Sequence, residues 1–318
     1  MSERLKKSVI QTLAYFSLFR QPLTKEELFF WRWDSPEKIS QRDFFTFLAQ
    51  GRTAGWWSEN TGFYCLPGRE ADVACRQERV KINETKMATA CQAIKKIFWV
   101  PFVRAVFVCN TVAQGTATAD SDIDVLVVTR RGRIFFTRAL VTLVASLGGV
   151  RRHHRKITDR LCLSFYIADD SLNLEKVALS SPDIYLSYWL RQLVPIYDPE
   201  DLGKSLRAAN QFLAQFFLPQ VSPELHPDWR LTLGRFGGRV KTFLEWLWGG
   251  SYGDLLEKQT REIQKTHMKL RAVYRGTDQP TSVVVTDSML KFHEQDRRQQ
   301  FKDQWQKILN DYGYEGTG

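Results

Sequence analysis

Hydrophobic residues follow a helical period from the start of the chain. Apolar positions in residues 3–18 recur at intervals of three and four, which predicts an amphipathic helix that Gln21-Pro22 ends. Thr24 stands three residues before Glu27, the spacing of a capping box, and this pair predicts the start of a second helix.

A third helix and an aromatic hairpin complete the first segment of the chain. The helix is expected over residues 35–50, with Ser35 as its N-cap. Residues 56–66 carry aromatic side chains on both sides of a turn that contains Gly62, which predicts two strands. Three helices followed by a hairpin are typical of a winged helix-turn-helix, so residues 1–68 are predicted to form a winged-helix-like module.

Short apolar strands dominate the middle of the chain. Residues 104–109, 123–128 and 161–167 each form an apolar run, and a helix is predicted over about 132–147. A polar helix over about 69–98 is expected to connect this unit to the first module. Strand, loop, strand, helix and strand in this order indicate an α/β or α+β unit, and α+β is the class we predict.

The pattern beyond residue 171 is mainly helical. Residues 281–285 are either one short strand or an extended linker. We therefore predict a winged-helix-like module over 1–68, a connector and core over 69–170, and a mainly helical region over 171–318. The helices are expected over about residues 181–193, 203–218, 234–248, 252–273 and 288–311.

The most informative motif lies at the start of the second apolar strand. Asp122 and Asp124 flank Ile123 directly before residues 125–128, which are all apolar. Residues two apart on a strand point to the same side, so the two carboxylates converge while Ile123 faces the core. A divalent cation relieves their repulsion, and Mg²⁺ prefers carboxylates together with substrate phosphates. Asp122 and Asp124 are therefore the candidate catalytic and metal-binding residues.

Composition and charge indicate a basic cytoplasmic protein with an anionic partner. The chain has 45 Lys and Arg against 35 Asp and Glu, a formal net charge of +10, which favours a nucleotide or nucleic acid. Its five cysteines are odd in number and none has CxxC spacing, so neither a disulfide framework nor a zinc site is expected. No apolar stretch near the N-terminus is long enough for a signal peptide or a membrane span, so no membrane partner is expected.

The acidic pair and the segment before it resemble the nucleotidyltransferase superfamily of DNA polymerase beta. That family carries a Gly-Ser pair after a first strand and then two acids spaced by one residue; Asn110-Thr111 and Asp122-Ile-Asp124 occupy these positions. Gly115 and Ser121 also look like the minimal members of the superfamily. The resemblance covers about residues 100–168. It implies a mixed sheet with helices, Mg²⁺ (or Mn²⁺) at the acidic pair, and an NTP, as substrate or ligand, held by Asn110, Thr111 and Ser121.

Two positions depart from the family pattern. Asn110 replaces the glycine, and Asn is the residue after Gly that best tolerates a left-handed backbone. Thr111 keeps the hydroxyl of the serine that it replaces. The family's third carboxylate commonly acts as the base from a later strand, and its position here is matched by Ser164. The acids that could substitute for it from the ends of strand 161–167 are Asp159, Asp169 and Asp170.

Basic residues crowd the segments around the acidic pair. Guanidinium groups bind phosphates bidentately, so a triphosphate suits this cluster; the alternative is a solvated basic face. The segment 132–138 is similar to that of uncharacterised bacterial proteins of the superfamily. The predicted triphosphate ligands are Arg133, Arg138, Lys156 and Arg160, and the wider cluster includes Arg130, Arg131, Arg151, Arg152 and Arg155.

The third helix of the winged-helix-like module offers Lys38, Gln41 and Arg42 to DNA. It also carries Glu37 and Asp43, so its charge is a poor match for the phosphate backbone. The alternative is a module that contacts protein.

Two features of the C-terminal region have a structural and a functional interpretation. The helix with Phe243 and Trp246 is expected to be core, or else an oligomer interface. His293, near Asp296 and Arg297, lies either on a helix surface or within reach of the active site.

The sequence thus predicts a nucleotide site. The expected reaction moves a nucleoside monophosphate from an NTP to a hydroxyl of a nucleic acid, protein or small molecule, and releases pyrophosphate. A catalytically degenerate, nucleotide-sensing winged-helix regulator is the second hypothesis, because the third acid and the Gly-Ser pair are missing. A third is one component of a toxin–antitoxin pair that acts on a protein or tRNA.

Overall fold

The helical period at the start of the chain produces the first two helices, α1 (Glu3–Ser17) and α2 (Lys25–Trp31). The capping box is confirmed: the Thr24 hydroxyl accepts a hydrogen bond from the Glu27 N–H, and the Glu27 carboxylate accepts one from the Thr24 N–H. These bonds satisfy donors that the first turn otherwise leaves unpaired. The structure is a computed structural model that describes residues 3–34, 39–217, 229–275, 283–292 and 296–314.

The third helix, α3 (Gln41–Thr53), begins later than predicted. Its N-cap is Ser40, whose hydroxyl accepts a hydrogen bond from the Asp43 N–H. Ser35, the expected N-cap, lies outside the described residues. Serine is a favoured N-cap at either position, so the pattern alone could not separate the two.

The aromatic hairpin is confirmed. β2 (Ser58–Asn60) and β3 (Phe63–Cys65) pair antiparallel, and Thr61 and Gly62 between them have φ angles of 49° and 84°. Positive φ at both turn positions matches the twist of the flanking strands. β1 (Leu23–Thr24) pairs with the other edge of β3, which gives the order β1-β3-β2.

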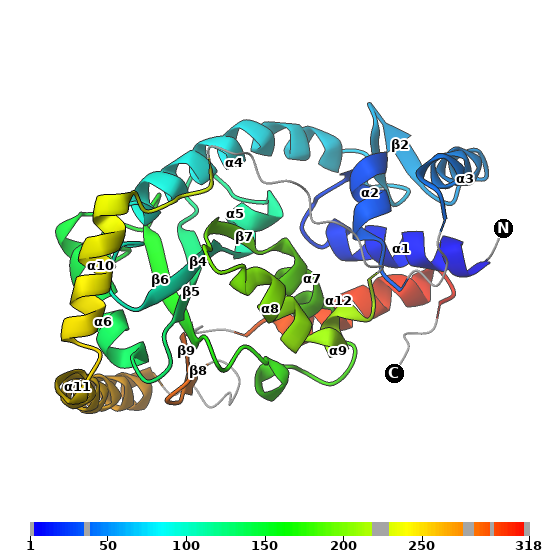
Figure 1. Cartoon of the computed structure of the whole chain (residues 1–318). Helices are drawn as coiled ribbons and strands as arrows, with labels where there is room; N and C mark the ends of the chain where they lie inside the picture. Colours follow the sequence, from blue (N-terminus) through cyan, green and yellow to red (C-terminus); the bar gives the residue numbers. More distant parts are fainter. Residues whose placement is uncertain (1–2, 35–38, 218–228, 276–282, 293–295, 315–318) are drawn as a thin grey trace.

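A six-stranded sheet lies at the other end of the elongated molecule (Figure 1). Within the described residues its order is β7-β4-β5-β6-β9-β8, with β5 and β6 parallel and the other neighbours antiparallel. β5 is buried at every position except Asp124, which is half-buried, as its unbroken apolar run predicts for a strand covered on both faces. The three predicted strands are confirmed as β4 (Val103–Val108), β5 (Ile123–Thr129) and β6 (Leu161–Ala168).

Helices connect and cover this sheet. The predicted connector is α4 (Asp72–Ile94), which runs from the N-terminal helices to the sheet (Figure 1). α5 (Asn110–Gln114) follows β4, and α6 (Ile134–Leu147) follows β5. α6 packs against β6 of the sheet and against α11 (Ser251–Arg275), the long helix from the C-terminal region.

The predicted helix over residues 288–311 is wrong at its start. β9 (Met289–Phe292) pairs antiparallel with β6, and α12 spans only Arg298–Asp311. The first three residues of β9 are buried, and burial beside β6 outweighs the helical spacing of the sequence. β8 (Val283–Val285) pairs with β9, so the structure shows a strand rather than a linker at these residues.

The rest of the C-terminal region supplies helices and one more strand. The single helix predicted over 203–218 is wrong, because it divides at Asn210, whose amide bonds to the Leu174 N–H and to the Leu172 and Leu206 carbonyls. Residue 218 lies outside the described residues. The remaining elements are a 3₁₀ turn at Glu175–Val177, α7 (Ile184–Gln192), β7 (Val194–Tyr197), α8 (Leu202–Ala209), α9 (Gln211–Ala214) and α10 (Arg235–Leu247).

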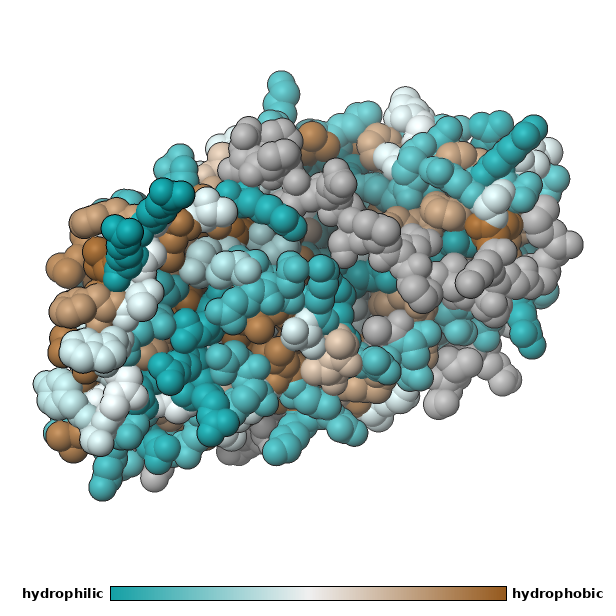
Figure 2. Space-filling model, viewed as in Figure 1, coloured by the Kyte–Doolittle hydropathy of each residue, from teal (hydrophilic) through white to brown (hydrophobic). Residues whose placement is uncertain are grey.

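The aromatic face of α10 is not core, which corrects the prediction. Phe243 and Trp246 are 58% and 75% exposed. Figure 2 shows apolar side chains on the surface at the end of the molecule where α10 lies. Lys241, on the opposite face, is buried and bonds to the sheet, because its ammonium donates to the Val103 carbonyl. Among the described residues, no helix is both long enough and apolar enough to cross a bilayer.

The last helix packs on the first. Trp305 of α12 is fully buried, and its indole N–H donates to the Gln11 carbonyl of α1 at 2.9 Å. Figure 1 shows the two helices side by side. The N-terminal core therefore includes residues from the far end of the chain.

Candidate functional site

Asp122 and Asp124 converge at the start of β5, as predicted from their spacing. Ile123 between them is fully buried, so the two carboxylates project from the opposite side of the chain. Cys162, on the parallel strand β6, is the register partner of Asp124. One ligand atom from each of Asp122, Asp124 and Cys162 lies within 4.8 Å of the others. A thiol thus joins the two carboxylates.

Asn110 holds Asp124 in position. It begins α5 with a φ of 53°, so it adopts the left-handed backbone that we expected of the residue replacing glycine. Its Nδ2 donates to Asp124 Oδ2 at 2.9 Å, and its Oδ1 accepts from Trp189 Nε1 at 2.9 Å. These bonds tie the acidic pair to α7 through a single side chain.

Arg152 completes the group. Its Nη1 lies 2.8 Å from Asp122 Oδ2 and 3.5 Å from Cys162 Sγ. The sequence places Arg152 only in the wider basic cluster and does not single out Cys162. Cys162 can be identified only from the register of β5 and β6, which sets it opposite Asp124. Arg152 is held at the start of β6 by the hydrogen bond from its backbone N–H to the Leu161 carbonyl.

Burial sets the protonation of this group. Burial raises the pKa of Asp124, and the charge of Asp122 adds to this, while the hydrogen bond from Asn110 opposes it. Burial also raises the pKa of the Cys162 thiol to about 12, so the thiol is uncharged at neutral pH. A neutral thiol does not supply the charge of a third carboxylate.

Ser164 does not face the acidic pair directly. A bulge in β6 shifts the register between Cys162 and Phe165, so Cys162 is the residue opposite Asp124. Ser164 Oγ lies 3.4 Å from Cys162 Sγ and contacts the group through that atom.

The three acids considered as substitutes lie at different edges of the sheet. Asp159 is beside the acidic pair, but its carboxylate bonds to the buried ammonium of Lys86 at 2.7 Å. Asp169 and Asp170 follow the opposite end of β6, since β5 and β6 run parallel. Asp169 there accepts a hydrogen bond from the Arg131 N–H. Only Asp159 therefore shares an edge with the pair.

Two of the predicted triphosphate ligands instead join α6 to α11. Arg133 pairs with Asp254 at 2.7 Å and donates to the Gly249 carbonyl. Arg138 donates to Gln264 Oε1 at 2.6 Å. These contacts give both guanidinium groups a role in packing.

Among the described residues, the side chains of the remaining predicted ligands make no hydrogen bond or ion pair with the acidic pair, and each has its own surroundings. Lys156 is exposed, and Arg160 bonds to the Gly149 carbonyl. The Ser121 hydroxyl accepts a hydrogen bond from the Thr118 N–H at 2.9 Å, and Thr111 is half-buried in α5.

Some of the residues predicted to face DNA, and the C-terminal histidine, lie outside the described residues. Gln41 and Arg42 are exposed at the start of α3, whereas Glu37, Lys38 and His293 lie outside the described residues.

The two carboxylates fit a hard divalent cation. Mg²⁺ commonly binds one or two carboxylates and takes its other ligands from substrate phosphates and water. Asp122 and Asp124 meet this requirement, whereas the neutral Cys162 thiol is a soft donor that suits Mg²⁺ poorly. Of the three residues, Asp122 and Asp124 are therefore the ones that could hold such a cation.

Comparison of the chain with protein-family models, with curated proteins and with solved structures finds no match.

Proposed function

We propose that this protein is a Mg²⁺-dependent nucleotidyltransferase of the DNA polymerase beta superfamily. The observation that supports it best is the convergence of Asp122 and Asp124 at the edge of a mixed sheet, with left-handed Asn110 bonded to Asp124. The reaction moves a nucleoside monophosphate from an NTP to a hydroxyl acceptor and releases pyrophosphate.

The roles of the side chains follow from their contacts. Asp122 and Asp124 hold the divalent cation, which when bound neutralises charge on the phosphates during transfer. Asn110 orients Asp124 through its amide. Arg152, now paired with Asp122, can turn its guanidinium to a phosphate oxygen.

A catalytically degenerate, nucleotide-sensing regulator is the second candidate. Two contacts favour the regulator. A neutral Cys162 thiol, and not a third carboxylate, stands opposite Asp124, and Arg152 already pairs with Asp122. Both reduce the negative charge that a bound cation would neutralise. The order α1-β1-α2-α3-β2-β3 supports a winged-helix-like module in front of the site, which could contact DNA or protein.

Isothermal titration with ATP, GTP, CTP and UTP, with and without Mg²⁺, tests the proposed site. The wild type is expected to bind at least one nucleotide in a Mg²⁺-dependent manner, and Asp122→Asn/Asp124→Asn to lose that binding. Asp120→Asn is the matched control, because Asp120 is exposed in the adjoining loop. If no nucleotide binds, or if the double variant binds like wild type, the proposed nucleotide site is wrong.

Pyrophosphate release separates the two candidates. A nucleotidyltransferase releases pyrophosphate when a mixture of candidate hydroxyl acceptors is added, and the double variant does not. Mg²⁺-dependent binding without release, together with a nucleotide-dependent affinity for duplex DNA, would favour the regulator.

A further inference from the structure

α10 is fixed to the sheet by charged side chains, which turns its apolar side outward. The buried Lys241 ammonium donates to the Val103 carbonyl. The Glu245 carboxylate accepts a hydrogen bond from the Phe102 N–H at 2.7 Å and pairs with Arg104 at 3.0 Å. An amphipathic helix normally covers a core with its apolar side. The orientation of α10 is the reverse, and these paired charges hold it.

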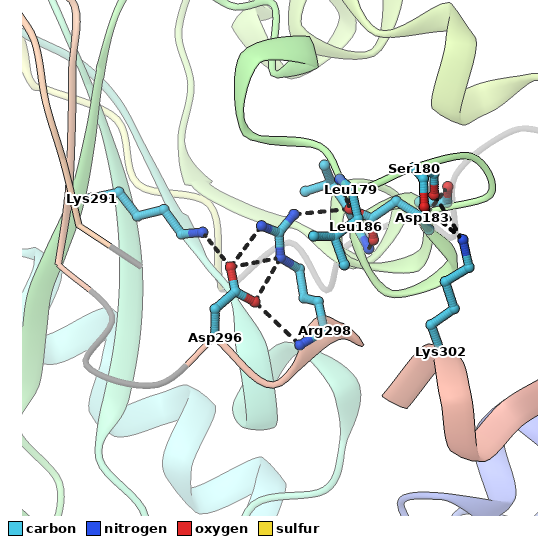
Figure 3. Close-up of polar contacts among 9 residues, drawn as sticks. Leu179, Ser180, Asp183, Leu186, Lys291, Asp296, Arg298 and Lys302 are labelled. Carbon is cyan, nitrogen blue, oxygen red and sulfur yellow. Dashed lines mark hydrogen bonds and ion pairs between the residues drawn. The ribbon is translucent and has the colours of Figure 1, made fainter. Parts of the chain in front are cut away.

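A second set of buried charges is matched within the chain in the same way. Arg298 of α12 bonds to Asp296 at 2.7 Å and to Asp183 at 2.9 Å, and Asp296 also pairs with Lys291 (Figure 3). Charges paired in this way satisfy one another and fix the elements that they join. On α10, by contrast, an apolar surface is left without cover from the described residues.

The outward side of α10 continues onto the start of α11. Figure 1 places both helices at the end of the molecule away from both termini, and Figure 2 shows apolar side chains gathered on that end. The rings of Phe243 and Trp246 lie 6.0 Å apart, so they form one surface. This surface, which we call the α10 face, consists of side chains that are 46% to 82% exposed: Phe236, Phe243, Trp246, Leu247, Tyr252 and Leu255.

The α10 face is large enough for an interface. Fully burying an aromatic side chain removes about 150–250 Å² from water, so the four aromatic side chains of this face expose roughly 400–700 Å². The largest apolar patch of a typical monomer is about 300–600 Å². Each partner in a standard interface contributes about 800 Å², and the two leucines and the polar residues around the rings bring the face close to that area.

The order of residues along α10 makes this face complementary to itself. Phe243 lies at its centre, Arg239 lies four residues before Phe243, and Trp246 lies three residues after it. A two-fold axis at Phe243 would set two copies of α10 antiparallel. Arg239 of each copy would then lie beside Trp246 of the other. A guanidinium group over a tryptophan ring is a favourable cation–π contact.

The charges of α10 select the antiparallel arrangement. Its exposed charged residues are Arg235 and Arg239, both near its N-terminal end. A parallel pair of helices would bring these guanidinium groups together. The antiparallel pair separates the two copies of Arg239 by about 12 Å along the helix axis, which exceeds the screening length of about 8 Å at physiological ionic strength. A second copy thus accommodates these charges without an acidic partner surface.

We propose that this chain forms a two-fold symmetric dimer in which α10 packs antiparallel against α10 of a second copy. Phe243 lies on the axis, and the starts of the two α11 helices lie at the rim of the interface. A two-fold axis is the commonest symmetry of soluble oligomers. This dimer does not depend on the proposed nucleotidyl transfer.

Sedimentation equilibrium of the full chain at about 0.1–100 µM tests the dimer. The mass is expected to reach twice that of one chain, with a dissociation constant in the micromolar range or tighter, as for interfaces of standard size. A chain that keeps its single mass up to the highest concentration overturns the proposal. If that single chain binds vesicles of anionic lipid, the face is instead a membrane contact.

Variants locate the interface. Phe243→Ala and Trp246→Ala are each expected to weaken the dimer about thirtyfold, because aromatic side chains at the centre of an interface carry most of its affinity. Val80→Ala, at an exposed apolar position of α4, is the control and should dimerise like the wild type. Both aromatic variants should keep the stability of the single chain, measured below the dissociation constant, because these side chains are exposed within it. A wild-type dimer in both would show that another surface forms it.

Cross-linking tests the antiparallel register. The proposed axis sets residue 239 of one copy opposite residue 247 of the other. A mixture of Arg239→Cys and Leu247→Cys is therefore expected to form disulfide-linked dimers under mild oxidation, and to do so faster than either variant alone. Equal rates in the mixture and in the separate variants would contradict the antiparallel packing of α10.

Discussion

The left-handed backbone of Asn110 places its amide between Asp124 and Trp189. Glycine adopts this backbone without strain, whereas alanine pays about 1 kcal/mol for it. Replacing Asn110 with either glycine or alanine removes its two side-chain hydrogen bonds. Their loss costs about 1–3 kcal/mol together when it leaves buried groups unpaired.

We therefore expect Asn110→Ala to lower the free energy of unfolding by about 1 kcal/mol more than Asn110→Gly. Urea denaturation of the two variants and the wild type measures this difference directly. Equal stability of the two variants would contradict the left-handed conformation, because the lost hydrogen bonds are the same in both.

The sequence predicts the acidic site better than its surroundings. Asp122 and Asp124 are predictable because period two on a strand fixes the side to which both point. Cys162 and Arg152 are not, since their contact with the pair depends on pairing between strands and on a bulge. Arg133 is predicted to bind phosphate from its guanidinium group and its place just after the acidic strand, but the position of α11, to which it bonds, has no local signal in the sequence.

At the scale of elements, Lys241 fastens α10 to the sheet. Its ammonium donates to the carbonyls of Phe98 and Val103 and to the Tyr197 hydroxyl, and it is 6% exposed. Burial lowers the pKa of Lys241 to about 8. In the unfolded chain a lysine titrates near pH 10.4, so between these values the unfolded state binds more protons.

Stability is therefore expected to rise as the pH increases from 8 to about 10.4, by up to about 3 kcal/mol from this residue. Lys241→Met removes the titrating group and should show a flatter dependence of the unfolding free energy on pH. Lys258→Met, at an exposed position of α11, is the control and should follow the wild type. Parallel pH profiles for wild type and Lys241→Met would contradict this assignment.

Elements were predictable where local chemistry specifies them. The capping box at Thr24 and the unbroken apolar run of β5 are local signals, and both gave the right element. β9 was missed because four residues between charged segments carry no reliable period, and only pairing with β6 makes them a strand. The aromatic face of α10 was misassigned because amphipathic spacing reports one apolar face without reporting what covers it.

At the scale of the whole molecule, α12 joins the N-terminal helices to the rest of the chain. Trp305 is fully buried, packs against Trp33 with ring centroids 6.0 Å apart, and bonds to the Gln11 carbonyl. Phe301 and Arg298 of the same helix line a pocket together with Asn110 of α5. One helix therefore contributes to both ends of the structure.

Trp305→Ala should lower the free energy of unfolding by about 3–5 kcal/mol, because it opens a large cavity in a packed core. Trp246→Ala removes the same side chain from a position that is 75% exposed, and should change it by no more than about 0.5 kcal/mol. Thermal and urea unfolding of both variants measure this contrast, and similar losses in the two would mean that Trp305 is not a core residue.

The contact between Trp305 and Gln11 spans 294 residues of sequence, and this has a consequence for synthesis on the ribosome. Part of the apolar side of α1 is covered by Trp305, which is translated 294 residues after Gln11. Contacts of such separation form slowly and leave apolar surface exposed in the meantime. The packing around α1 is thus completed only after α12 has been translated, and until then its uncovered side is a surface for chaperones.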